Sequence, residues 1–223
     1  SRGLGDVYKR QVAGGGLTTG NYNIAIGQET LAATTTANNN IAVGHNALNA
    51  NTTGAQNTAI GRAALLKNTT ASYNVAVGYY ALEDTTTGAN NVAVGSFALE
   101  SNTASNNTAV GDIALRVNTT GSENVAVGKG ALGSNTTASY NTAVGQDALT
   151  ANTTGAEHVA VGARALQTNT TGADNTAVGF SALELNTTGS YNVAVGGQAL
   201  EANTTAGSCT AIGFFALGSN TPG

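Results

Sequence analysis

The chain has 223 residues, a net charge of −4 and only 9% charged residues, with 30 glycines and neither Met nor Trp. Scarce basic residues argue against a nucleic-acid-binding protein, and the lack of a long apolar run argues against a membrane-spanning segment. Aromatic residues make up 5% of the chain, so its Ala, Val and Leu must supply a thin core rather than a large globular one. Because Met is absent, we expect a fragment or a processed product. Repeat stacks need polar caps at their ends, and because no cap is recognisable we expect the native protein to continue in both directions.

Residues 1–16 come first and do not share the pattern of the rest. They hold three of the chain's eight basic residues, at Arg2, Lys9 and Arg10. We expect a linker or capping segment, or an artefactual stretch foreign to the protein, and assign it no function. Residues 17–223 form the repeat domain, which we expect to be incomplete at both ends.

A short motif, Ala-Val-Gly or Ala-Ile-Gly, recurs throughout residues 17–223. Of the eleven intervals between its glycines, ten are 17 residues long and one is 16. Such a fixed period is the signature of a repeat architecture. The motif ends at Gly27, Gly44, Gly61, Gly78, Gly95, Gly111, Gly128, Gly145, Gly162, Gly179, Gly196 and Gly213.

The unit predicts an all-β protein, a parallel β-solenoid of about twelve 17-residue coils. Seventeen residues are too few for a pair of helices, and the Asn-Thr-Thr-Gly that closes most units favours turns and strands. We expect one strand around Thr142–Val144, a weaker one around Ala148–Leu149, and a turn after each. The 16-residue unit, 91–106, should lose its missing residue from an exposed turn without breaking the stack.

Each position of the unit predicts a place in the coil. Ala143 and Ala148 mark positions too tight for larger side chains, and Gly145 marks a turn closed to residues with a Cβ. Asn141 and Asn152 are expected at corners, in the left-handed region, with their side chains forming hydrogen-bonded ladders from coil to coil. The residues expected to point inward are Val43, Ile60, Val77 and Val94 before the glycines, and Leu48, Leu65, Leu82 and Leu99 after them.

The core Asn-(Thr/Val)-Ala-(Val/Ile)-Gly resembles the YadA-like head repeats of trimeric autotransporter adhesins. The fuller unit, with Ala-Leu and Asn-Thr-Thr-Gly added, is similar to repeats of bacterial and phage tail-fibre-domain proteins. The resemblance covers residues 17–223, although the unit is longer than the adhesin head repeat. It implies a left-handed β-roll, a homotrimer, an extracellular place on a cell surface or virion, and a host-surface protein or glycan as receptor. The thin core also leads us to expect an oligomer.

No catalytic arrangement stands out, and we expect a non-enzymatic protein without catalytic, cofactor-binding or metal-binding residues. His45 and His158 occupy different positions of the unit, which indicates exposed substitutions rather than a repeated metal site. Cys209 replaces a corner Asn and has no histidine nearby in the chain to act as its base. Calcium binding is not expected, because the Gly-Gly-x-Gly-x-Asp repeat is missing. The carboxylates expected to keep the surface soluble are Asp112, Asp147, Glu184 and Glu201.

Aromatic residues fall at two places in the unit, where they can contact a partner or a glycan, or pack on a neighbouring chain; packing is the favoured interpretation. Four precede a corner Asn: Tyr22, Tyr73, Tyr140 and Tyr191. Six follow a glycine: Tyr79, Tyr80, Phe97, Phe180, Phe214 and Phe215.

Two further patterns involve threonine. Asn-x-Thr sequons recur at one corner, and we interpret them as structural ladders rather than glycosylation sites. The stacked pairs Thr136-Thr137 and Thr153-Thr154 raise ice binding as the alternative function, although adjacent residues of a strand face opposite ways. The sequons lie at Asn51, Asn68, Asn118, Asn135, Asn152, Asn169, Asn186 and Asn203.

The leading functional hypothesis for the chain is a structural or adhesive segment of a surface adhesin or tail-fibre protein.

Overall fold

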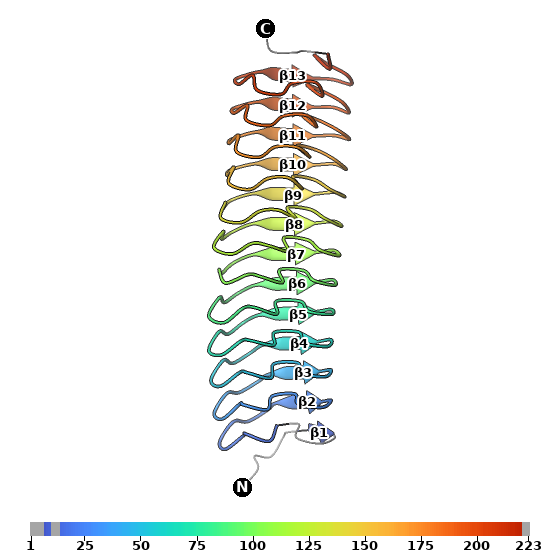
Figure 1. The fold of residues 1–223 in the computed structure, drawn as a ribbon. Coiled ribbons are helices and arrows are strands. Elements are labelled where there is room, and N and C mark those ends of the chain that lie inside the picture. The colour runs from blue at the N-terminus through green and yellow to red at the C-terminus, as the bar shows by residue number, and fades with distance from the viewer. Residues whose placement is uncertain (1–6, 10–13, 220–223) are drawn as a thin grey trace. The chain divides into compact units, whose positions relative to one another are not determined.

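The computed structural model describes residues 7–9 and 14–219, and these contain strands and turns but no helix. The chain divides into two compact units, Ser1–Asn107 and Thr108–Gly223, which we describe separately. Figure 1 shows that successive coils within each unit stack their strands one above the next, with loops connecting them.

Each coil contributes one strand of three residues. The strands pair in parallel at an offset of one repeat, as in Thr142↔Val159 and Val144↔Val161. The predicted parallel β-solenoid is therefore confirmed. The first unit contains β1 (Val7–Lys9), β2 (Ile24–Ile26), β3 (Ile41–Val43), β4 (Thr58–Ile60), β5 (Val75–Val77) and β6 (Val92–Val94). The second contains β7 (Thr108–Val110), β8 (Val125–Val127), β9 (Thr142–Val144), β10 (Val159–Val161), β11 (Thr176–Val178), β12 (Val193–Val195) and β13 (Thr210–Ile212).

Two expectations about the coil's course need revision. The second strand predicted at Ala148–Leu149 is wrong, because these residues lie in a continuous turn segment. Leu149 has a φ of +53°, a left-handed conformation that an extended strand does not contain. Near the start of the chain, β1 lies inside the segment 1–16, where the sequence predicted no coil. It pairs with β2 at the same offset, Val7 opposite Ile24, so the stack begins earlier than the sequence pattern indicated.

The core of each coil consists of small residues and one leucine. The central Ala of each strand from β2 to β12 is fully buried, as are the Ala-Leu pairs of the turn, for example Ala148 and Leu149. The prediction that Val43, Ile60, Val77 and Val94 point inward is wrong: Ile60 is 40% exposed and Val94 36%. Side chains alternate along a strand, so a central Ala that points inward sends both of its neighbours outward.

Two ladders of buried asparagines replace much of the missing hydrophobic core. In the first, the backbone N–H of each coil's leading Asn donates to the side-chain oxygen of the Asn one coil earlier; Asn57 N to Asn40 Oδ1 is 2.9 Å. In the second, side-chain amides bond directly, as Asn152 Nδ2 to Asn135 Oδ1 at 3.1 Å. The predicted ladders are confirmed, and the sequon asparagines are fully buried. A glycan cannot occupy these amides in the folded coil.

The left-handed residues are not those that the sequence indicated. Asn141 and Asn152 do not have positive φ, whereas Tyr140, Asp147 and Leu149 do, at 62°, 55° and 53°. Left-handed backbone at a residue other than Gly costs on the order of 1 kcal/mol or more. The leucine offsets this cost by complete burial, and the other two positions hold short or exposed side chains in most coils. The ladder amides also bond within their own repeat unit: Asn141 Nδ2 and Asn152 Nδ2 both donate to the carbonyl of Gly155, at 3.1 and 2.8 Å.

The 16-residue coil keeps its hydrogen bonds despite the missing residue. Asn107 N still donates to Asn91 Oδ1 at 2.9 Å, and Asn91 Nδ2 donates to the carbonyl of Ala104 at 2.9 Å. The deletion lies in the turn at Thr103–Ser105, as the sequence predicted.

Candidate functional site: the sheet face and its flanks

In each of the two units, the outward side of the strands forms a surface that is here called the sheet face. It consists of the first and third residues of each strand from β2 to β13, all of which are Thr, Val or Ile. None of these residues is buried; Ile41, Val125 and Val159, for example, are 36–39% exposed. Soluble monomers rarely expose long contiguous apolar patches. The residue types of this face stay within Thr, Val and Ile from coil to coil, and none of them carries a charge.

A leading flank borders the sheet face where each strand begins. It is the residue directly before the coil's leading Asn or its substitute, and it has a positive φ in every such coil. The four tyrosines predicted to share one position lie here, with exposed fractions of 57–66%. In the second unit this flank also carries Glu123, Glu157 and Asp174, all exposed and without a basic residue among them. An open depression of about 450 Å³ separates Tyr140 and Glu157 from Thr142 and Val159 of the sheet face.

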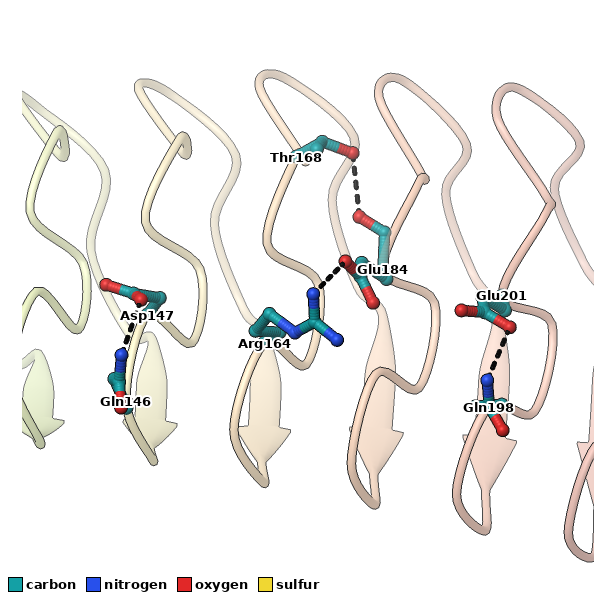
Figure 2. Close-up of polar contacts among 7 residues, drawn as sticks. All are labelled: Gln146, Asp147, Arg164, Thr168, Glu184, Gln198 and Glu201. Atoms are coloured by element: carbon teal, nitrogen blue, oxygen red, sulfur yellow. Dashed lines mark hydrogen bonds and ion pairs between the residues drawn. The ribbon is translucent and has the colours of Figure 1, made fainter.

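A trailing flank borders the opposite side of the sheet face. It consists of the two residues after each strand's glycine, and it carries the basic residues Arg62, Lys129 and Arg164. Figure 2 shows Arg164 reaching Glu184 in the following coil, with Arg164 Nη1 and Glu184 Oε1 3.3 Å apart. Nearby, Gln198 Nε2 donates to Glu201 Oε2 at 3.1 Å. The predicted surface carboxylates Glu184 and Glu201 thus make specific contacts beside this flank.

Aromatic residues of the trailing flank form a cluster in the first unit. The rings of Tyr80 and Phe97 stack with centroids 5.8 Å apart, and Tyr79 meets both rings edge-on. The guanidinium of Arg62 lies 5.7 Å from the Tyr79 centroid. In the second unit Arg164 lies 4.9 Å from the Phe180 centroid. The rings of this cluster thus contact one another and a guanidinium within the same chain; packing on a neighbouring chain stays a prediction.

No family model, curated protein or solved structure matches this chain. Within the described residues, no group of three or more His, Cys, Asp and Glu side chains gathers as metal ligands do. Nor does any helix of the described ranges reach the length and apolarity that crossing a bilayer requires. Cys209 is half-buried, and its Sγ lies 3.6 Å from the carbonyl of Gly207.

The two histidines differ in their surroundings. His45 is exposed, as predicted, but His158 is only 1% exposed, so the expectation of an exposed substitution is wrong for it. The His158 ring replaces an Asn of the first ladder: its Nδ1 accepts from Asn175 N at 3.2 Å, as an Asn oxygen does. Burial is the main cause that lowers the pKa of His158 to about 4. An apparent Asn substitution in the sequence was the signal that this side chain joins the ladder.

Acidification should destabilise the fold through His158. Between pH 6.5 and 4 the unfolded chain binds a proton that the folded chain resists, because burial lowers the folded pKa of His158 to about 4. Above pH 6.5 the free energy of unfolding is not reduced by His158, and it falls by about 3 kcal/mol as the pH drops from 6.5 to 4. Urea unfolding across this range should show that His158→Asn, which restores the ladder residue, removes this loss. The exposed His45→Asn is the control; an equal effect of both substitutions would contradict the assignment.

The threonine pairs expose a single free hydroxyl row. The first Thr of each pair donates its hydroxyl to a backbone carbonyl in the next coil, as Thr153 Oγ1 to Thr170 O at 3.1 Å. The second, Thr154 in that coil, is exposed. One row of exposed hydroxyls is narrower than the two-column hydroxyl surface that the ice-binding alternative would use.

Proposed function

We propose that this chain is a non-catalytic structural and adhesive segment that assembles with copies of itself through the sheet face. The observation that carries the proposal is the exposure of Thr, Val and Ile columns that contain no charge. Covering such a surface removes apolar area from water at a gain of about 25 cal/mol per Å². Identical coil spacing in each copy lets side chains of one face fit between those of another along each unit.

The resemblance to adhesin head repeats and tail-fibre repeats supports three copies and an extracellular place on a cell surface or virion. In such an assembly the turns opposite the sheet face would remain exposed, and their variable residues would supply contacts to a host-surface protein or glycan. The small core adds to this argument, because one leucine per coil leaves a stack that gains much from association.

The proposal predicts that charges placed on the sheet face abolish assembly but leave the coils folded. Val144→Lys combined with Val161→Lys puts two ammonium groups on adjacent strands, where a partner copy would bury them without a counter-charge. Light scattering should give a multiple of the 21.9 kDa chain mass for the original protein and the single chain mass for the variant.

The matched control is Thr154→Lys combined with Thr171→Lys, which adds the same charge at exposed positions on another side of the coil. It should assemble as the original does, and circular dichroism should show the same strand content for all three proteins. An original protein that stays at the single chain mass up to high concentration would contradict the proposal.

Ice binding through the threonine pairs is the alternative raised by the sequence. It has weaker support, since the first hydroxyl of each pair is bonded to backbone. Thermal hysteresis of a dilute solution would be the observation in its favour.

A further inference from the structure

We infer that the two flanks of the sheet face are complementary between copies, and that Glu123 and Glu157 of one copy pair with Lys129 and Arg164 of the next. This inference rests on the assembly proposed above and specifies its orientation and contacts. The geometry that supports it is the position of the flanks on either side of the same strand.

Glu123 and Lys129 bracket β8, and Glu157 and Arg164 bracket β10. The strand and its ends keep the two Cα atoms of the first pair up to about 20 Å apart and those of the second up to about 25 Å. The salt bridges of the described residues join Lys67 to Asp84 and Arg164 to Glu184, so Glu123, Lys129 and Glu157 have no ionic partner within this part of the chain.

Cyclic symmetry would bring these charges together. When copies with parallel axes pack their sheet faces around a common axis, the leading flank of one copy meets the trailing flank of the next. Symmetry keeps equivalent residues at one height, and the two residues that bracket a strand also lie at one height. Glu123 therefore faces Lys129 of a second copy, and Glu157 faces Arg164.

The other strands fit the same arrangement. Where a carboxylate stands on one flank of a strand, the opposite flank carries no carboxylate; this holds for β2 to β6 and for β8 to β13. Across β9, for example, Tyr140 would face Gln146 and Asp147, whose oxygens can accept a hydrogen bond from its hydroxyl. The depression beside Tyr140 and Glu157 is lined by a carboxylate and a ring, which suits a guanidinium such as that of Arg164.

An antiparallel pair of copies would lack this complementarity. A two-fold axis perpendicular to the stack brings each leading flank onto the leading flank of the other copy. In the second unit that flank holds Glu123, Glu157 and Asp174 and no base, so carboxylates would meet carboxylates. The charges thus favour the parallel orientation.

The test reverses one charge at a time and then both. Glu123→Lys or Lys129→Glu alone should weaken association, measured by analytical ultracentrifugation at low salt, by about tenfold to a hundredfold, because every interface of the ring replaces an attraction with a repulsion. The double variant carries both reversals, regains opposite charges at every interface, and should associate within about threefold of the original. Arg116→Glu, an exposed reversal after Leu115 and away from the sheet face, is the matched control and should have no effect.

The outcomes separate the two proposals. An original protein that is a monomer would overturn the assembly itself. Assembly that tolerates both single reversals, or that the double variant fails to restore, would overturn the flank pairing while the proposed function stands.

Discussion

Replacing Gly145 with alanine should lower the free energy of unfolding by about 3–5 kcal/mol. Gly145 has a φ of +138°, a region that residues with a Cβ rarely adopt. An added Cβ would also lie 2.5 Å from the carbonyl carbon and oxygen of Gly162 in the next coil. Backbone in a stacked coil cannot withdraw without breaking its own ladder bonds, so strain and overlap add together. Guanidinium unfolding monitored by circular dichroism measures the loss.

Gly189→Ala is the control for this substitution. Gly189 does not have a positive φ, and Ala71, Ala138 and Ala206 occupy its position in other coils. An added Cβ would lie 2.3 Å from the carbonyl oxygen of Ala206 and 2.4 Å from Asn186 Oδ1, but the coils with alanine here already accommodate a methyl group. Because the backbone conformation suits alanine, we expect a loss of about 1 kcal/mol or less. Equal losses for Gly145→Ala and Gly189→Ala would contradict the role assigned to the glycine after each strand.

Breaking the second asparagine ladder should have the next largest effect. Asn152 Nδ2 donates to Asn135 Oδ1 at 3.1 Å and to Gly155 O at 2.8 Å, and its own oxygen accepts from Asn169 Nδ2 at 2.9 Å. Asn152→Val removes all three bonds and leaves a buried amide oxygen on Asn135 without a donor. We expect a loss of about 2–4 kcal/mol in the free energy of unfolding.

Asn152→Thr has nearly the same shape as Asn152→Val but keeps a hydroxyl. Threonine already occupies this position at Thr34, where Oγ1 donates to Asn51 O at 3.0 Å and Asn51 Nδ2 approaches the same oxygen at 3.4 Å. The threonine variant should therefore be about 1–2 kcal/mol more stable than the valine variant. If both variants unfold at the same denaturant concentration, the ladder hydrogen bonds contribute little to stability, and burial alone stabilises the turn at residue 152.

The repeat period was sufficient to predict the solenoid, the parallel pairing and the asparagine ladders. A motif that returns every 17 residues leaves little choice of architecture, because each short unit must bury its apolar residues against the next. The tolerance of the shortened coil followed from the same logic, since an exposed turn makes few contacts with other coils.

The direction of the valines could not be read from hydrophobicity alone. Val and Ile before the glycine look like core residues, but a three-residue strand has room for only one inward side chain. The invariant Ala143 and its equivalents were the signal, because alternation sends the residues on either side of an inward alanine outward. The first strand position holds Thr in some coils and Val in others, as at Thr142 and Val159. This exchange also indicated that the position faces outward.

The left-handed leucines had no local signal, and the burial of His158 was signalled only by its place at a ladder-asparagine position. Leucine ordinarily avoids positive φ, and only the closure of a thin coil around Leu149 and its equivalents accounts for it. Histidine at an asparagine position looks like a surface change until the ladder geometry shows that its Nδ1 replaces the amide oxygen.

Chemical cross-linking between copies tests most directly whether sheet faces pack together. The protein needed carries Val144→Cys together with Cys209→Asn, which removes the only native thiol and restores a ladder asparagine. The comparison variant carries Thr154→Cys in place of Val144→Cys, again together with Cys209→Asn. With a short bis-maleimide, the account predicts covalently joined copies for the cysteine at 144 and single chains for the cysteine at 154. Equal cross-linking at both positions, or none at 144, would contradict it.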